Sequence, residues 1–154
     1  MSASPLIAPE ELTRPMRARA GGRGMDTEGL RRALEKAVEG EVRFDAGTKA
    51  LYAMDASHYR QIPIGVVIPK SKEDVIETVR VCREFGAPLL SRAGGTSLAG
   101  QTVNAAVVID WSKYMHRILE INPRERWARV LPGTVCDELR DEALRVTGNL
   151  LNWG

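Results

Sequence analysis

Residues 64–91 read IGVVIPKSKEDVIETVRVCREFGAPLLS, the pattern of a strand, a helix and a second strand. The run 64–68 is apolar except for its glycine, which is typical of a strand covered on both faces. Residues 71–74 have the form of a capping box, and Gly86 and Pro88 end the helix before apolar residues resume. Because crossover connections are right-handed, the two strands are predicted to run parallel in a layered α/β fold.

The helix within this unit has apolar side chains at helical spacing. We expect them to form its buried face: Val75, Ile76, Val79, Cys82 and Phe85. Upstream, residues 27–39 predict a helix stopped by Gly40, residues 42–45 a short strand, and residues 48–55 one or two helical turns. Downstream, residues 105–110 predict a third buried strand.

The last patterned segments predict a hairpin and a helix. Strands at 117–121 and 127–130 are joined by a turn at 122–125. Thr134 is expected to cap a helix that runs to about Arg145. Its predicted buried face is Val135, Leu139, Ala143 and Val146. The whole pattern predicts a small mixed sheet with flanking helices, an α/β (α+β) fold.

Composition favours one globular domain, because the chain has 154 residues, of which 44% are apolar and 27% charged. Residues 1–24 lack an apolar period and predict a disordered arm ahead of a domain at 25–154. The arm has four arginines against two glutamates, so the net charge of +2 resides there. A neutral body with 5% aromatic residues argues against a nucleic-acid partner.

The two cysteines indicate a reducing compartment. Cys82 and Cys136 both fall in predicted helices without metal-ligand spacing, and we expect both to be buried structural thiols. No apolar run approaches the roughly 20 residues of a transmembrane helix, and the N-terminus lacks the apolar centre of a secretory signal. These features predict a cytoplasmic protein.

The segment SRAGGTSLAGQ at residues 91–101 carries the strongest functional signal. Its small residues let a ligand approach the backbone, and consecutive N–H groups turned inward form a nest that binds anions. Thr96 and Ser97 add hydroxyl groups, and Arg92 adds a positive charge that suits a phosphate. A pyrophosphate fits these groups, although glycines in an ordinary flexible turn are the alternative.

Two other phosphate-binding loops do not fit this context. A Walker loop needs a Gly-Lys-Ser/Thr ending, which the segment lacks. The dinucleotide fingerprint needs a long helix after its glycines, whereas only residues 101–104 separate Gly100 from the next predicted strand.

Four segments, in order along the chain, resemble the FAD-binding domain of the vanillyl-alcohol oxidase and p-cresol methylhydroxylase (PCMH/VAO) type. They are YAMDASHYR at 52–60 with Pro63, VIP at 67–69 with EDV at 73–75, RAGGTSLAGQ at 92–101, and VLPG at 130–133. Within that type, the chain is most similar to the N-terminal part of FAD-linked D-2-hydroxyacid dehydrogenases, such as those for D-lactate and glycolate. The resemblance spans roughly residues 26–145.

The resemblance implies that the loop wraps the diphosphate of FAD, mainly through main-chain N–H groups. The residues concerned are Arg92, Ala93, Gly94, Gly95, Thr96, Ser97, Gly100 and Gln101. It also places Pro69 and Gly133 near the cofactor. Relatives with covalently attached flavin have a histidine at the position of Thr96, so the resemblance implies non-covalent FAD.

The resemblance further implies a parent enzyme that oxidises a D-2-hydroxy acid and passes electrons to an acceptor. An iron–sulfur domain or subunit is an open option for that acceptor, with a membrane-peripheral location through it. The tail at 149–154 departs from the family pattern, and the catalytic part is expected to lie outside this chain. A truncated, non-catalytic nucleotide-binding or interaction module is the alternative.

No residue of this chain is assigned a catalytic or metal-binding role. Apart from Asp55, three residues before His58, the two histidines His58 and His116 lack partners at ligand spacing, and both are expected on the surface. Asp110 is explained by capping of the turn after its strand, and Trp111 and Tyr114 are explained by packing.

Overall fold

The computed structural model describes residues 24–148. The predicted arm at 1–24, apart from Gly24, and the tail at 149–154 lie outside the described residues. The elements in chain order are α2 (Thr27–Ala37), β1 (Glu41–Arg43), α3 (Ala46–Leu51), β2 (Gly65–Ile68), α4 (Lys72–Phe85), β3 (Leu89–Arg92), β4 (Val107–Asp110), β5 (Ile118–Asn122), β6 (Trp127–Val130) and α5 (Cys136–Thr147). In this part of the chain no helix combines the length and hydropathy of a membrane span.

The larger sheet has the strand order β1-β2-β4-β3, with β1 antiparallel and the other three strands parallel. The predicted parallel orientation of β2 and β3 is confirmed, but β4 lies between them. All four residues of β4 are buried, as are those of β2, so both strands need neighbours on two edges. The partly exposed β3 takes the sheet edge.

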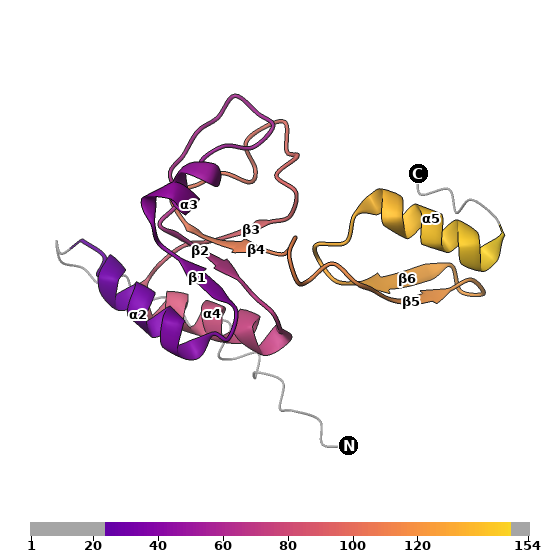
Figure 1. Cartoon of the computed structure of the whole chain (residues 1–154), viewed down its shortest axis with the longest axis horizontal. Coiled ribbons are helices and arrows are strands. Elements are labelled where there is room, and N and C mark those ends of the chain that lie inside the picture. The colour runs from indigo at the N-terminus through magenta and orange to yellow at the C-terminus, as the bar shows by residue number, and fades with distance from the viewer. Residues whose placement is uncertain (1–23, 149–154) are drawn as a thin grey trace, which may run out of the picture.

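Helices α2 and α4 cover one face of this sheet (Figure 1). The core between them consists of Leu30, Leu34, Val38, Val67, Val81, Cys82, Ala87 and Val107. On the opposite face Tyr52 and Tyr114 pack against the buried Val66, Ile68 and Val108. The second face is therefore covered largely by loop residues.

The predicted buried face of α4 is partly wrong. Ile76 and Val79 are each 45% exposed, whereas Asp74 and Thr78 are buried with Val81 and Cys82. The Asp74 carboxylate accepts hydrogen bonds from the main-chain N–H groups of Glu39 at 2.9 Å and Lys70 at 2.8 Å. These partners satisfy a buried charge and set the rotation of the helix.

Helices α2, α3 and α4 each begin directly after the residue that caps them. Asp26 accepts from Gly29 N at 2.8 Å at the start of α2, and Ser71 accepts from Asp74 N at 3.1 Å at the start of α4. Asp45 caps α3, which therefore lies at 46–51 and shortens β1 to end at Arg43.

The hairpin is confirmed as β5 and β6, a separate two-stranded sheet beside α5 (Figure 1). The predicted cap of α5 is wrong: the cap position is Val135, and Thr134 donates its hydroxyl to Leu131 O at 2.8 Å. Of the predicted face, Ala143 is buried but Val135 and Val146 are exposed. Cys136 is also exposed, contrary to prediction, because it occupies the first turn of a helix that buries little. Cys82 is buried as predicted.

Candidate functional site

The glycine-rich segment forms the first part of the connection between β3 and β4 (residues 93–106). It runs beside the connection between α3 and β2 (residues 52–64), and the two rise together above the sheet (Figure 1). Ala56 N donates to Gly95 O at 3.0 Å, and Ala105 N donates to the Gln61 side chain at 2.9 Å. All eight residues of the predicted site lie on this one connection and the end of β3 that leads into it.

Two glycines of the loop are required by its backbone. Gly95 has φ +64° and Gly100 has φ +78°, both in the left-handed region. A Cβ at Gly95 would lie 2.5 Å from Arg92 Nη2, and one at Gly100 would lie 2.7 Å from the ring of Tyr59. At Gly94, by contrast, a Cβ would meet only Thr96 Cγ2, at 3.7 Å. Gly94 therefore faces open space.

The loop offers a run of free amides. Within residues 24–148, no protein atom accepts a hydrogen bond from the main-chain N–H groups of Gly94 to Leu98. Two of the amides that follow have acceptors: Ala99 N donates to Gln101 Oε1 at 3.2 Å, and Gln101 N donates to Ser97 Oγ at 3.1 Å. Five successive N–H groups of this glycine loop therefore remain available as hydrogen-bond donors.

Several side chains of the predicted site form hydrogen bonds that hold the loop in its conformation. Ser97 donates its hydroxyl to Gln101 Oε1, which closes the turn over 97–101. The Arg92 guanidinium donates to Met54 O at 2.8 Å and to Thr102 O at 3.0 Å, and it stacks 5.3 Å from the centroid of the Tyr52 ring. Ala93 and Thr96 are exposed on the loop surface. The guanidinium of Arg92 thus donates to two main-chain carbonyls, and its expected contact with a phosphate stays a prediction.

Pro69 and Gly133, which the resemblance places near the cofactor, are both buried. Pro69 is fully enclosed, and Gly133 lies against the carbonyl groups of Trp111 and Met115. Neither residue lines the exposed loop.

The segment at 52–61 is the part of the site that the sequence did not assign. Asp55 accepts from Thr102 Oγ1 at 2.9 Å and from Ser57 N at 2.9 Å. Hydrogen bonds from Ser57 and then Thr102 lower the pKa of Asp55 to about 2, so its carboxylate is ionised at neutral pH. The sequence feature that could have pointed to this segment is the motif at 52–60, which carries part of the family resemblance and includes Asp55.

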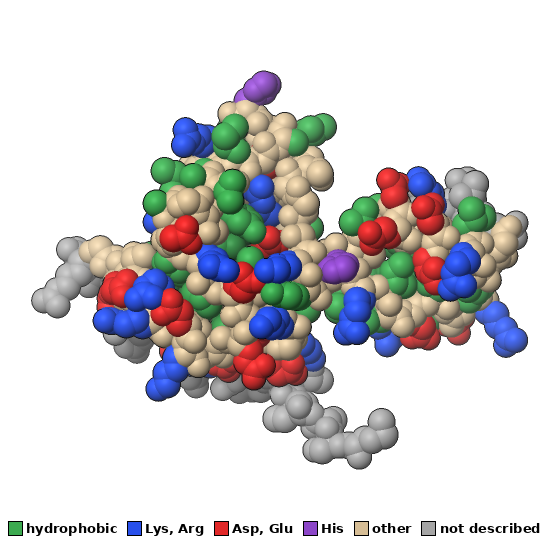
Figure 2. Space-filling view, in the orientation of Figure 1, with side chains coloured by type: hydrophobic (Ala, Val, Ile, Leu, Met, Phe, Trp, Pro, Cys, Tyr) green, Lys and Arg blue, Asp and Glu red, His purple; other side chains and the backbone are tan. Residues whose placement is uncertain are grey.

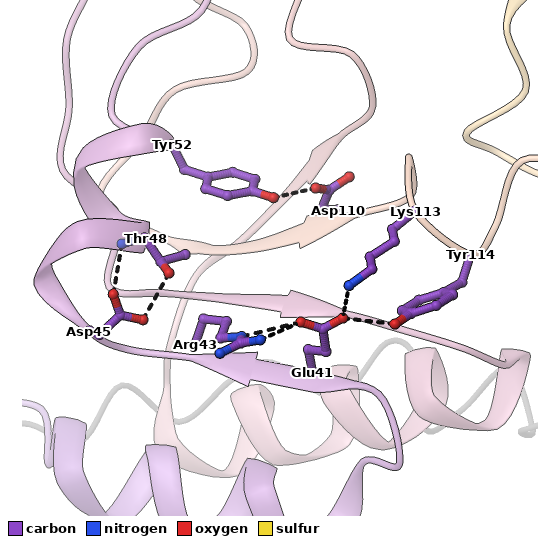
Figure 3. A network of polar contacts seen from close by, with 8 residues as sticks. All are labelled: Glu41, Arg43, Asp45, Thr48, Tyr52, Asp110, Lys113 and Tyr114. Carbon is purple, nitrogen blue, oxygen red and sulfur yellow. Dashed lines mark hydrogen bonds and ion pairs between the residues drawn. The ribbon is translucent and has the colours of Figure 1, made fainter.

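Asp110 is buried at the end of β4, with its carboxylate paired on both sides. It accepts from Ser112 N at 2.7 Å, as the capping interpretation predicts, and also from the hydroxyl of Tyr52 (Figure 3). Burial, together with Asp110, raises the pKa of Tyr52 above its usual value. Tyr52 thus remains a hydrogen-bond donor and supports the stacked Arg92.

Glu41 forms a second polar cluster that ties β1 to the turn after β4 (Figure 3). Its carboxylate accepts from Lys113, from Arg43 Nη2 at 2.7 Å and from the Tyr114 hydroxyl at 2.8 Å. These partners, Lys113 first, lower the pKa of Glu41 to about 2. Both histidines are exposed, as predicted (Figure 2).

Relatives are similar to this chain over part of their length. The chain is 40% identical over 106 residues to D-2-hydroxyglutarate dehydrogenase of Pseudomonas putida, covering 65% of this chain and 10% of that protein. It is 30% identical over 103 residues to glycolate oxidase subunit GlcD of Bacillus subtilis, covering 64% of this chain and 22% of that one. It is 29% identical over 101 residues to the mitochondrial D-lactate dehydrogenase (cytochrome) of Kluyveromyces lactis, covering 63% and 18%. The chain thus spans about a tenth to a fifth of the length of these relatives.

Solved structures share the fold. The chain superimposes on 4-ethylphenol oxidase from Gulosibacter chungangensis with a TM-score of 0.63 and 27% identity, covering 82% of this chain and 26% of that one. For p-cresol methylhydroxylase the TM-score is also 0.63, with 18% identity and the same coverage. The predicted α+β fold of the PCMH type is confirmed.

A sequence profile described as "FAD binding domain" matches residues 63–153. That range includes the whole glycine loop, and it also reaches into the tail at 149–154 that the sequence analysis set apart from the family. The match covers more than half of the chain. The chain belongs to the FAD binding domain family.

Proposed function

We propose that this chain holds the diphosphate of FAD in a flavin-dependent oxidoreductase that oxidises a D-2-hydroxy acid such as lactate or glycolate. The observation that carries the proposal is the run of free amides from Gly94 to Leu98. The substrate class is supported by the relatives, which are named as a D-2-hydroxyglutarate dehydrogenase, a D-lactate dehydrogenase and a glycolate oxidase subunit.

The residues of the loop suit a diphosphate. The five amides supply donors without adding a net charge, and Gly94 leaves space for a ligand to approach the backbone. Bound FAD would supply the hydride-accepting flavin ring, as cofactors carry the redox chemistry in such enzymes. The residues described here bind and orient the phosphate end and keep its donors fixed.

We infer that the FAD is bound without a covalent link, because Thr96 occupies the position at which covalent relatives have histidine. A denaturing gel of the purified yellow protein tests this inference. Flavin fluorescence is expected at the dye front, and fluorescence that migrates with the 17.0 kDa band would contradict it.

FAD titration of the 154-residue chain tests the loop assignment. Gly94→Asp places a carboxylate against the diphosphate and is expected to abolish quenching of flavin fluorescence. Gly24→Asp, at a glycine outside the loop whose Cβ position has no atom within 4 Å, is the matched control and is expected to bind like the wild type. Unchanged binding by Gly94→Asp would remove the loop from the site.

The same titration separates the alternative function. A wild-type chain that binds no FAD but forms a stable complex with a partner protein would favour a non-catalytic interaction module.

We also infer that the protein is cytoplasmic and that its electron acceptor is an iron–sulfur or membrane-associated protein. Within the chain, we infer that residues 25–154 form the FAD-holding unit and that residues 1–24 are dispensable for FAD binding. Deletion of residues 2–24 is expected to leave the FAD affinity unchanged, and a tenfold loss would contradict that boundary.

A further inference from the structure

The Arg92 side chain joins the two ends of the glycine loop. Arg92 stands at the end of β3, and its Nη1 donates to Thr102 O at 3.0 Å, ten residues later. Its Nη2 donates to Met54 O at 2.8 Å, in the neighbouring segment. The ring of Tyr52, 5.3 Å from the guanidinium carbon, supports the same group. A planar fork with several donors is suited to bridging two carbonyls at once.

Asp55 binds the other polar groups of the same residue, Thr102. It accepts from Thr102 Oγ1 at 2.9 Å and from Thr102 N at 3.4 Å, while Ser57 donates to it from N at 2.9 Å and Oγ at 2.5 Å. Arg92 and Asp55 therefore fix the carbonyl, the amide and the hydroxyl of Thr102 together.

This arrangement reaches the free amides directly. The residue after Asp55, Ala56, donates its N–H to Gly95 O at 3.0 Å, within the run from Gly94 to Leu98. A Cβ at Gly95 would lie 2.5 Å from Arg92 Nη2, so the glycine leaves the room that the guanidinium occupies. The shape of the loop and the position of Arg92 thus depend on each other.

We propose that Asp55 and Arg92 are positioning residues that hold Thr102 between them and thereby preorganise the loop amides for the FAD diphosphate. The inference rests on the proposed function of the loop. It assigns Arg92 a role through the backbone of the loop instead of a direct ion pair with phosphate. Preorganised donors bind more tightly because less conformational entropy is lost on binding.

The test is FAD affinity at several salt concentrations for Asp55→Asn, Arg92→Gln and the double variant. Each single variant is expected to weaken FAD binding about tenfold, the scale of one charge-assisted hydrogen bond. The double variant is expected to be no more than about threefold weaker than the weaker single variant, because both act on one element. The salt dependence of the dissociation constant is expected to match the wild type in all three.

Other outcomes overturn the proposal. Additive losses in the double variant, or a reduced salt dependence in Arg92→Gln alone, would assign Arg92 a direct phosphate contact. Wild-type affinity in both single variants would show that the two residues do not position the loop. If Gly94→Asp still abolishes binding in that case, the loop assignment stands and only the positioning role fails.

A milder variant guards against loss of folding. Thr102→Val removes one hydroxyl from Asp55 and keeps the main-chain groups that Arg92 and Asp55 bind. We expect about a tenfold loss of FAD affinity, the scale of one hydrogen bond to a charged group. Thr27→Val, which removes an exposed hydroxyl on α2, is the control and is expected to bind FAD like the wild type. Equal affinities for the two variants would contradict the proposal.

Discussion

Gly94→Ala, at the first residue of the run of free amides, is expected to weaken FAD binding without destabilising the fold. Its Cβ would meet a single atom, Thr96 Cγ2, at an ordinary contact distance of 3.7 Å, and Gly94 does not have the positive φ of Gly95 or Gly100. The unliganded chain should therefore accept the methyl group. Its stability is expected to stay equal or to rise by about 0.4–1 kcal/mol, because alanine restricts the unfolded chain.

FAD binding should respond very differently, because the methyl group would project beside the free amides. A phosphate displaced from two of them loses two hydrogen bonds to a charged group, each of about 1.5–3 kcal/mol. Even the lower end of this range, about 3 kcal/mol in total, corresponds to at least a roughly hundredfold weaker binding.

Two measurements test this prediction. Quenching of flavin fluorescence during FAD titration gives the affinity, and thermal unfolding of the unliganded chain gives the stability. Gly24→Ala is the control, since its Cβ position is also open. A Gly94→Ala chain that unfolds normally and binds FAD within threefold of the wild type would refute the placement of the diphosphate at these amides.

Three further predictions concern the fold. Glu41 has a pKa lowered to about 2, below its unfolded value, so it stabilises the fold above about pH 4.5 and this contribution is lost as the pH falls toward 2; the melting temperature of the wild type should fall more steeply than that of Glu41→Gln over this range, and parallel curves would contradict the ion-paired network. Burial raises the pKa of Cys82 to about 11, so a thiol reagent at pH 8 should label the exposed Cys136 quickly and Cys82 only after unfolding; rapid labelling of both thiols in the native protein would argue against the packing of α4. Leu30→Ala should cost about 2–5 kcal/mol because Leu30 is fully buried, whereas Leu98→Ala, at a side chain 82% exposed, should change the free energy of unfolding by less than about 0.5 kcal/mol in urea titrations; equal costs would contradict the core.

The elements that the sequence predicts well are those with local causes. The buried strands β2 and β4 appear as short apolar runs because both of their faces are covered. The starts of α2 and α4 are marked by Asp26 and Ser71, whose side chains bond to amides three residues later.

The errors arise where a distant partner decides the outcome. The rotation of α4 depends on Asp74, whose acceptors are satisfied by Glu39 and Lys70, and no periodic pattern within the helix reports those partners. The insertion of β4 between β2 and β3 likewise depends on which strands need two neighbours, a property of the whole sheet. Cys136 is exposed because α5 lies on a two-stranded hairpin, which offers little surface to bury it.

The site shows the same division between local and distant causes. The glycines of the loop could be recognised from sequence because left-handed backbone and close approach favour glycine locally. The role of Arg92 could not, because the carbonyls that it binds come from Met54 and Thr102, 38 and 10 residues away. From sequence alone, an arginine beside a glycine loop is most simply interpreted as a phosphate ligand, because the main-chain carbonyls that it binds cannot be recognised.

The connection at 93–106 is also longer than most loops in compact domains, and glycine-rich chain of that length loses much entropy when it is ordered. Its own turn, closed by Ser97 and Gln101, fixes only one end of the exposed run of amides. The other constraints come from residues 52–61, through Asp55 and Ala56. A glycine-rich loop without an aspartate and an arginine in these places would have the same donors but would have to order them on binding. In this chain, the proposed order of the loop therefore depends on Asp55, Arg92 and Thr102 as well as on its glycines.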